Sequence, residues 1–490
     1  MSAFFSFLID ASYFLISHII VVNIILSAIV VFFNRKNPTS VWAWLLVLNA
    51  LPVVGFIVYL FVGLDLHKVH LFRSKEVEDR LEKDIRRQKM MVKNQDFTGI
   101  DEDILQYADL ALYHLQTGGA LLSADNEIRF FTEGTDKFES LKEDLRNAKS
   151  SIHIQYYIIR NDEVFEEIHE ILKEKVKEGV EVRILYDYMG CYGLSALFWR
   201  KLEKEGIQRA CFFSGSLGKL TLRVNYRNHR KIVVIDNKIG YVGGFNVARE
   251  YIGKSKKFGH WRDTHMRIVG TAVNSLQIRF ILDWNFSKRS KSIEIDPYIS
   301  HVNFDIRDKV PMQIISSGPD SKDQYIRNTY LRMIQKAKKS IYIQTPYFIL
   351  DDALTTALIM ALNSGITVNL MIPCKPDHPF VYWATISHAG ELIMEGANCY
   401  IYDDGFLHAK GMIVDDTVLC YGTANMDIRS FALDFEVNAL IYDKKAAKEM
   451  VEAFEKDALK SHLLTKEKYA KRGLIIRFRE RVDRLLSPLL

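Results

Sequence analysis

The residues of this sequence that are best suited to carry out a reaction form a short motif that occurs twice. Each copy has a His, a Lys two positions later and an Asp five positions after the Lys. The members are His229, Lys231 and Asp236 in the first copy, and His408, Lys410 and Asp415 in the second. One copy would be weak evidence, because such side chains also occur together on half-exposed strands. Two copies in matching positions are strong evidence for a shared site.

These residue types suit attack on a phosphodiester, whose anionic oxygens repel nucleophiles. If His and Lys lie on a strand, alternate side chains point to one face and converge on one phosphate. One imidazole can attack phosphorus while the other protonates the departing alkoxide, and the residues do not distinguish these two roles. Lys231 and Lys410 can donate to the nonbridging oxygens, and two amides that end a Gly-x-x-Asn pattern, Asn246 and Asn425, add neutral donors. This chemistry requires no metal and no other cofactor.

The segments around the two motifs are also repeated in the same order. Residues 141–157 show a helical pattern followed by a strand pattern, and residues 330–347 repeat it. Residues 179–185 match residues 365–371 in the same way, and equivalent positions are about 180 residues apart, far above the period of a solenoid. We therefore expect an α/β fold with two duplicated α/β/α domains that have mixed sheets and pack about a pseudo-twofold axis. The expected domains span residues 121–300 and 301–470.

The amino-terminal region is unusually apolar. Residues 11–33 and 41–62 contain no Lys, Arg, Asp or Glu, and each stretch is long enough to cross a bilayer. Residues 34–40 form a polar turn between them, so we predict a two-helix transmembrane hairpin in residues 1–65. Basic residues are more numerous after the second stretch than in the turn, which favours a cytoplasmic body. The alternative is a pair of helices buried in a soluble core.

Segments rich in charge flank the two predicted domains. Residues 66–120 are predicted to form a charged helical linker. Residues 471–490 alternate Arg with apolar side chains and are predicted to form a basic amphipathic tail, which suits a helix lying on anionic lipid or, equally, one docked against the body. The net charge of +5, from 65 basic and 60 acidic residues, is too balanced for a protein that coats nucleic acid.

The duplicated motif resembles that of the phospholipase D superfamily. The similarity extends from about residue 123 to about residue 442. Within it, residues 225–231, 405–410 and 422–431 resemble the bacterial cardiolipin synthase branch in particular. The apolar amino-terminal hairpin fits that branch too. The resemblance therefore implies two phospholipase D-like domains behind a membrane anchor.

The resemblance also implies a role for each candidate site residue. His229 would be the nucleophile, and His408 the general acid and then the general base. An acidic residue orients each histidine in the family, and Asp263 and Glu436 stand in matching places. We expect crossed pairing, Glu436 with His229 and Asp263 with His408. Two motif residues are expected to support the strand and its loop rather than to contact phosphate: Asp236 and Asp415.

The activity implied by the resemblance is phosphatidyl transfer. A phosphatidyl group would pass from one phosphatidylglycerol to another through a phosphohistidine, giving cardiolipin and glycerol without a cofactor. The implied partners are phosphatidylglycerol, other anionic phospholipids and the membrane, but not nucleic acid, and assembly into a homo-oligomer stays open. The implied location is the bacterial inner membrane, with a multi-pass anchor and the catalytic body on the cytoplasmic face.

Three alternatives to this activity remain. A phospholipase D hydrolase would use the same residues and release phosphatidic acid, and the sequence does not exclude it. A phosphodiesterase nuclease of the superfamily needs no membrane spans, and the sequence has no stripe of interleaved basic and aromatic residues. A noncatalytic membrane scaffold would be favoured if one motif were degraded, but both motifs are intact.

Overall fold

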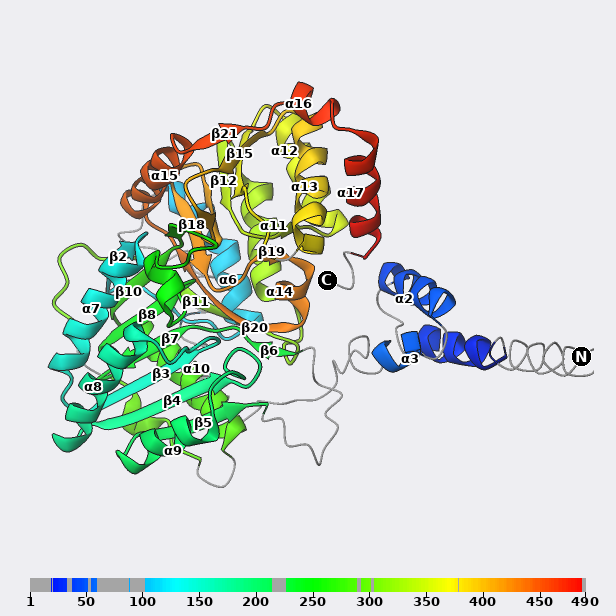
Figure 1. Ribbon diagram of the computed structural model, residues 1–490. Helices are drawn as coiled ribbons and strands as arrows, with labels where there is room; N and C mark the ends of the chain where they lie inside the picture. Colours follow the sequence, from blue (N-terminus) through cyan, green and yellow to red (C-terminus); the bar gives the residue numbers. More distant parts are fainter. Residues whose placement is uncertain are drawn as a thin grey trace, which may run out of the picture.

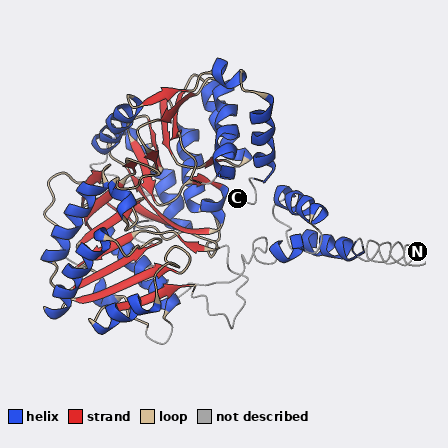
Figure 2. Ribbon diagram, viewed as in Figure 1, coloured by secondary structure: helices blue, strands red, loops and turns tan. Residues whose placement is uncertain are grey.

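The computed structural model in Figure 1 shows two adjoining halves, each built around one large sheet. It describes residues 19, 21–32, 38–51, 54–59, 88, 102–213, 226–288, 292–300, 304–377 and 379–486. Figure 2 shows that helices cover the strands of both halves. Each large sheet contains both parallel and antiparallel pairs. The predicted α/β class with mixed sheets is therefore confirmed.

The sheet of the first half has seven strands in the order β2-β10-β8-β7-β3-β4-β5. β3, β4 and β5 are parallel neighbours, and the other pairs are antiparallel. The strands are β2 (Asn126–Phe131), β3 (Ser151–Tyr156), β4 (Glu181–Asp187), β5 (Gln208–Phe212), β7 (Ile232–Ile235), β8 (Ile239–Gly243) and β10 (His265–Gly270). The helices are α7 (Gly134–Asn147), α8 (Glu163–Lys177), α9 (Ala196–Lys204) and α10 (Ala272–Ser287), with short 3-10 turns at Arg249–Ile252 and Asp296–Tyr298.

The sheet of the second half has ten strands, nine of which follow the order β1-β11-β20-β18-β17-β12-β14-β15-β21. These are β1 (Leu122–Ser123), β11 (Met312–Ser317), β12 (Ser340–Gln344), β14 (Thr367–Pro373), β15 (Asn398–Tyr402), β17 (Gly411–Val414), β18 (Val418–Gly422), β20 (Asp434–Ile441) and β21 (Ser461–Leu463). The larger helices are α11 (Tyr325–Lys336), α12 (Asp352–Asn363), α13 (Pro379–Met394), α15 (Lys444–Ala458) and α17 (Leu474–Leu486). Two shorter ones are α14 (Ile428–Ala432) and α16 (Lys466–Ala470).

The two sheets are copies of one another. The order β11-β20-β18-β17-β12-β14-β15 repeats that of the first half strand for strand. The matching helices α8 and α12 are even capped alike: the side chains of Asp162 and Asp351 accept hydrogen bonds from backbone N–H groups of the first turn. Gly179 and Gly365 follow these helices with φ of 88° and 85°, a left-handed conformation that favours glycine. The duplication predicted from the sequence is thus present in detail.

A shared apolar core joins the halves. Ile232 and Met266 of the first sheet lie in one buried cluster with Leu419 and Val437 of the second. Helix α10 contacts β7 and β10 of its own half and also β11 of the other. Burial of this much apolar surface from both halves makes them a single packed body rather than two domains on a tether.

A segment that precedes the first sheet packs on the second half. After the short helix α5 (Glu102–Leu105), helix α6 (Ala108–Thr117) buries Leu110 and Ala111 in the core of the second half. Strand β1 then pairs antiparallel with β11. This part of the predicted linker therefore belongs to the folded body, while the predicted domain limits themselves stay predictions.

At the amino terminus the described elements are a helix in residues 21–32, α2 (Pro38–Ala50) and α3 (Val54–Val58). Val30, Trp44 and Tyr59 meet in a small apolar cluster, so these helices pack on one another. Within the described residues no helix has the length and apolarity that crossing a membrane requires. Much of the predicted hairpin, at residues 1–18, 20, 33–37, 52–53 and 60–65, lies outside the described residues.

Arg230 ties the halves together and gives a test of stability. One guanidinium nitrogen lies 2.8 Å from both carboxylate oxygens of Asp283 in its own half, and the other two donate to the backbone oxygens of Glu436 and Ser317 in the second half. Arg230→Ala breaks the buried pair, leaves Asp283 only the more distant Arg279 at 4.0 Å, and removes two hydrogen bonds between the halves, so the free energy of unfolding should fall by about 3–5 kcal/mol. Urea-dependent pulse proteolysis of the detergent-solubilised protein measures the change.

The matched control for Arg230→Ala is Lys445→Ala, which removes the exposed pair between Lys445 and Asp308. That change should cost less than about 1 kcal/mol. Equal losses from the two variants would contradict the importance assigned to the buried pair.

Candidate active site

Each histidine of the repeated motif is held by backbone from the opposite half. β6 (Arg227–Asn228), just before His229, pairs in parallel with the start of β20, and the His229 N–H donates to the Phe435 oxygen at 3.0 Å. β16 (Phe406–Leu407), just before His408, pairs in parallel with β9 (Trp261–Arg262) of the first half. The His408 N–H donates to the Arg262 oxygen at 2.7 Å. The two motifs therefore meet at the junction of the halves.

The crossed strands place an acidic side chain beside each imidazole. His229 Nδ1 lies 2.8 Å from Glu436 Oε1, and His408 Nδ1 lies 2.6 Å from Asp263 Oδ2. Both carboxylates are fully buried. This arrangement matches the crossed pairing expected from the sequence. Because Nδ1 is engaged in both rings, Nε2 is the nitrogen left for a substrate.

Both histidines line one pocket of about 510 Å³ between the halves. A third parallel pair, β13 (Phe348–Ile349) with β19 (Met426–Asp427), lies at its border. Aromatic side chains from both halves form much of its wall: Tyr157, Tyr251, Phe258, Trp261 and Tyr347. A pocket of this size holds a phosphate with its glycerol groups but not the acyl chains of two phospholipids.

The two motif lysines are buried beneath the histidines. Lys231 Nζ donates to the His229 carbonyl oxygen at 2.7 Å, and Lys410 Nζ lies 2.7 Å from His408 Nδ1 and 3.7 Å from Asp263 Oδ2. Burial lowers the pKa of Lys231 to about 7 and that of Lys410 to about 8. An anionic phosphate in the pocket would favour the protonated form of both.

The imidazoles are neutral in the free enzyme. Burial and the charge of Lys231 hold the pKa of His229 well below its ordinary value. Burial and the charge of Lys410 lower the pKa of His408 to about 4, against the opposing effect of Asp263. A neutral imidazole is a nucleophile, and it becomes a proton donor only after it has taken up a proton.

The two orienting carboxylates differ in charge state. Burial raises the pKa of Glu436 to about 7. Burial also favours the neutral form of Asp263, but the charges of Lys410 and His408 outweigh it and lower the pKa of Asp263. The repeat positions next to them differ as well: the Thr423 hydroxyl donates to Glu436, whereas a side chain at the equivalent Gly244 would collide with Asp263. The site is therefore pseudo-symmetric in backbone and asymmetric in electrostatics.

The two amides that end the Gly-x-x-Asn pattern lie in the same pocket with different partners. Asn246 accepts a hydrogen bond from the Ile158 N–H at 3.0 Å and donates one to the Tyr251 hydroxyl at 2.8 Å. The side-chain oxygen of Asn425 is buried without a hydrogen-bond partner among the described residues. Each amide keeps at least one N–H with which to contact a phosphate oxygen.

The motif aspartates lie away from the pocket. Asp236 accepts hydrogen bonds from the backbone N–H groups of residues 149–151, and Asp415 accepts them from those of residues 338–340, all at 2.7–3.0 Å. Each aspartate thus fixes the loop that leads into the central strand of its sheet, β3 or β12. These contacts are those that a support of the strand and its loop would make, and that role stays a prediction.

Several pocket residues were not singled out from the sequence. Arg227 and Arg429 line the pocket and add positive charge around the phosphate position. Both lie in the segments that resemble the family, two residues before His229 and four after Asn425, so proximity to the motif was the available signal. Tyr157 and Tyr347 follow the matching strands β3 and β12, and the repeat could have identified them as a pair.

Comparison with known proteins agrees with this geometry. The family described as "Cardiolipin synthase, PLD-like domain" matches residues 141–257 and 330–458, and "Phospholipase_D-nuclease N-terminal" matches residues 21–63. A cardiolipin synthase of Staphylococcus aureus is 48% identical over 472 residues, which cover 96% of this chain and 95% of that protein. The major cardiolipin synthase ClsA of Bacillus subtilis is 47% identical over 481 residues, 97% and 99% of the two chains.

A solved structure extends the comparison to the fold. The phosphatidylserine synthase of Haemophilus influenzae Rd KW20 superposes with a TM-score of 0.58 over 78% of this chain and 97% of its own, at 16% identity. The duplicated fold and the paired His-Lys motifs are those of phospholipase D-like proteins. With the full-length relatives, they show that the chain belongs to the cardiolipin synthase family of phospholipase D type.

The position of the motif aspartates predicts a structural effect of their removal. Asp236→Ala and Asp415→Ala each deprive three backbone N–H groups of their acceptor and should lower the free energy of unfolding by about 1–3 kcal/mol. Turnover per folded molecule should stay unchanged. Pulse proteolysis and activity assays on the same samples measure both quantities, with the exposed Asp308→Ala as control. Loss of turnover at full stability would instead assign the aspartates to catalysis.

Proposed function

We propose that the protein synthesises cardiolipin by transferring a phosphatidyl group from one phosphatidylglycerol to a second, with His229 as the nucleophile. The observation that carries the proposal is the convergence of both histidines, each with a carboxylate from the opposite half, on one pocket with buried lysines. Family membership supports the same reaction, because the full-length relatives are named cardiolipin synthases.

When the anionic phosphodiester binds, its charge and that of Asp263 favour uptake of a proton by His408. In the first step, neutral His229 attacks phosphorus and the protonated His408 transfers its proton to the departing glycerol. The bond between phosphorus and the glycerol oxygen breaks as a bond between phosphorus and nitrogen forms, leaving a phosphatidyl-histidine. In the second step, His408 removes the proton from a hydroxyl of a second phosphatidylglycerol, whose oxygen displaces His229 from phosphorus. The products are cardiolipin and glycerol, and the exchange of one phosphodiester for another needs no nucleotide.

The asymmetry of the carboxylates supports this division of roles. Asp263 is ionised and stabilises a protonated His408, which suits a proton carrier. Glu436 has a pKa of about 7 and is only partly ionised near neutral pH. It therefore stabilises a protonated His229 less than Asp263 stabilises a protonated His408, which suits a neutral, attacking His229. Lys231 and Lys410 would neutralise the nonbridging oxygens as charge moves through the transition state, and Arg227 and Arg429 extend that positive field.

The pocket wall bears on the choice between transfer and hydrolysis. A hydrolase with the same residues would release phosphatidic acid if water reached the intermediate. Aromatic side chains surround the histidines, and the ring centroids of Trp261 and His408 are 5.0 Å apart. These side chains limit the space for water beside a bound phospholipid. This favours the second phosphatidylglycerol as the acceptor.

The proposed setting is the inner membrane of a bacterium. Residues 1–65 would anchor the protein there, with the body on the cytoplasmic face. Anionic phospholipids would be both the substrate and the surrounding surface. The match of residues 21–63 to an amino-terminal family region supports a separate amino-terminal module.

The reaction and the roles of the histidines can be tested together. Protein in detergent micelles with phosphatidylglycerol and a chelator should produce cardiolipin and glycerol, and His229→Ala and His408→Ala should each lose more than about a thousandfold in rate. After denaturation in alkali, a label on the lipid phosphorus should remain attached to His229, because the phosphorus–nitrogen bond is labile in acid rather than in base, although the acyl chains are saponified.

Three results of that experiment would contradict the proposal. Phosphatidic acid as the sole product would mean a hydrolase. Label on His408 would reverse the roles of the two histidines. No turnover of any phospholipid would favour the nuclease or scaffold alternatives.

The lysine pKa values predict the alkaline side of the pH profile. kcat/KM should fall as the pH rises through about 7 to 8, because Lys231 and Lys410 lose their charge in the free enzyme. The corresponding fall in kcat should come at higher pH, since bound phosphate favours the protonated lysines. Lys231→Arg should extend the kcat/KM plateau to higher pH at a lower rate, because arginine stays charged. A profile that is flat above pH 7 would contradict the assignment.

A further inference from the structure

Helix α17, near the carboxyl terminus, carries its apolar side chains on the face that points away from the body. Spacings of three and four residues put them on one stripe. The most exposed members of this outer stripe are Leu474 (82%), Ile475 (84%), Phe478 (71%) and Leu485 (62%). The inner face of the helix instead carries Glu480 and Asp483, each 3% exposed. The helix is amphipathic, but its apolar face points away from the body and its acidic side chains point toward it, the reverse of an ordinary surface helix.

Ion pairs hold this orientation. Glu480 accepts from Arg472 at 2.8 Å, and Arg484 reaches Glu391 on α13 at 2.6 Å. The guanidinium of Arg479 lies 5.5 Å from the ring centroid of Trp383, also on α13. A helix whose sole purpose was to cover the body would bury its apolar stripe there. α17 docks through charge and leaves its apolar stripe exposed, a pattern that marks an interaction surface.

The exposed charges of α17 are all basic. Its two acidic residues, Glu480 and Asp483, are the buried ones, whereas Arg477, Arg479 and Arg481 flank the outer stripe and are exposed. Long arginine side chains beside an apolar stripe can keep their charge at phosphate level while the stripe lies among acyl chains. The charge pattern is complementary to an anionic lipid surface.

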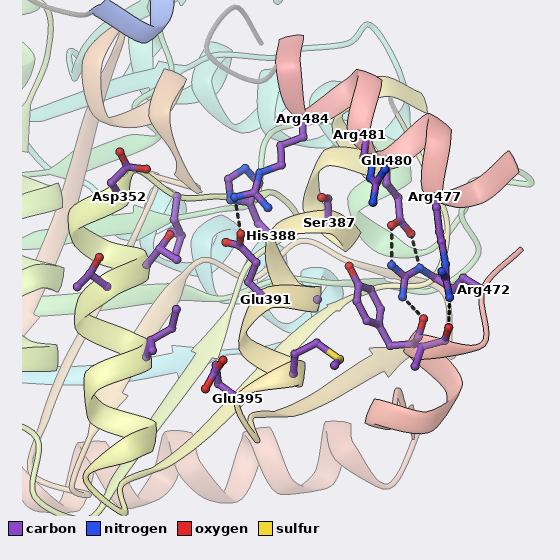
Figure 3. Close-up of a pocket in the computed structure, with 18 residues that line it drawn as sticks. Asp352, Ser387, His388, Glu391, Glu395, Arg472, Arg477, Glu480, Arg481 and Arg484 are labelled. Atoms are coloured by element: carbon purple, nitrogen blue, oxygen red, sulfur yellow. Dashed lines mark hydrogen bonds and ion pairs between the residues drawn. The ribbon is translucent and has the colours of Figure 1, made fainter. Parts of the chain in front are cut away.

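A pocket of about 800 Å³ lies directly beneath this helix, between α17, α12 and α13. Figure 3 shows Arg477 and Arg481 of α17 across from Ser387 and His388 of α13, with Arg484 next to His388. His388 is 7% exposed, and neither of its ring nitrogens has a hydrogen-bond partner among the described residues. Four carboxylates also line the pocket, and two of them, Glu480 and Glu391, are paired with Arg472 and Arg484. Arg477, Arg481 and the unused imidazole of His388 are therefore the groups available to a phosphate-bearing headgroup.

The same helix α13 connects this surface to the active site. Val381, near the start of α13, lines the catalytic pocket, and Phe380 beside it is 56% exposed. Ser387, His388 and Glu391, further along, line the pocket beneath α17. Figure 1 shows α13 and α17 side by side at one edge of the second half.

We propose that α17 is an interfacial helix that seats the catalytic body on an anionic phospholipid bilayer. Its outer stripe enters the headgroup boundary, and Arg477 and Arg481 with His388 hold a lipid headgroup over the pocket. A second copy of the chain fits less well, because a twofold contact would oppose like-charged arginines from both helices. The inference rests on the proposed function, since it supposes a substrate taken from a bilayer.

Substitution of the stripe tests this proposal in the full-length protein. Phe478→Glu combined with Leu485→Glu should reduce cardiolipin formation from vesicles of phosphatidylglycerol by about tenfold or more. It should leave turnover of short-chain phosphatidylglycerol, dispersed as monomers, unchanged. The matched control is Leu459→Glu, at the end of α15, where an equally apolar side chain is 88% exposed outside the stripe. Equal activity of wild type and double variant on vesicles would overturn the proposal.

A direct measurement of the insertion of α17 into the bilayer makes the test independent of enzyme activity. The Phe478→Trp variant is made in the His229→Ala background, which does not turn over the lipid. After the signal of the six native tryptophans is subtracted, its fluorescence should be quenched by brominated phosphatidylglycerol but not by brominated phosphatidylcholine. Inorganic phosphate, added at the same concentration as the lipid phosphate, should not reduce this quenching.

The outcomes separate the two proposals. No quenching in either lipid, or equal quenching of Leu459→Trp, would overturn the role of α17. A dimer in light scattering that Phe478→Glu dissolves would assign the stripe to a second copy instead. Wild type that makes no cardiolipin even from monomeric lipid would contradict the proposed function, while the quenching would still report on the helix.

Discussion

Each histidine of the site is hydrogen-bonded to a carboxylate that belongs to the other half of the chain. The short parallel pairs β6 with β20 and β9 with β16 create this exchange, and the rest of the site depends on it. A site of two imidazoles, two carboxylates and two ammonium groups is expensive to bury unless every charge has a partner. The shared core and the hydrogen bonds of Arg230 to the backbone of the second half keep the halves together, so the partners stay within reach.

The pseudo-symmetry of the fold does not extend to the charges of the carboxylates beside the histidines. The same backbone positions carry Glu in one half and Asp in the other, with a Thr beside the Glu and a Gly beside the Asp. The two carboxylates also differ in charge state: burial raises the pKa of Glu436 to about 7, although Thr423 opposes the shift, whereas the charges of Lys410 and His408 outweigh burial and keep Asp263 ionised. Such a difference biases one histidine toward attack and the other toward proton transfer, whereas two histidines in identical surroundings could take either task.

Much of the fold could be predicted from the sequence, because the repeat and the strand periodicity are local patterns. The helix and strand pair at residues 141–157 and its copy at residues 330–347 appear as α7 with β3 and α11 with β12. The pairing of Glu436 with His229 was inferred from motif position, and it required two segments about 200 residues apart to meet.

What the sequence did not indicate depends on tertiary contacts. The packing of α6 on the second half and the lining of the pocket by Arg227 and Arg429 arise from surfaces that meet only in the folded chain. For the tail, the sequence left lipid contact and docking on the body as alternatives. The structure shows the docking, and the outward stripe of α17 appears only when Glu480 and Asp483 are seen to be buried.

The exchange of strands between the halves also bears on how such a chain can arise and change. A single repeat could form the same contacts only as a homodimer, and its two half-sites would then be identical by symmetry. Joining the repeats in one polypeptide releases them from that identity, so each can accept its own mutations. The two repeats nevertheless stay dependent on each other. A change of register in either sheet would move the carboxylate that pairs with the histidine of the other repeat, so the two must evolve as one unit.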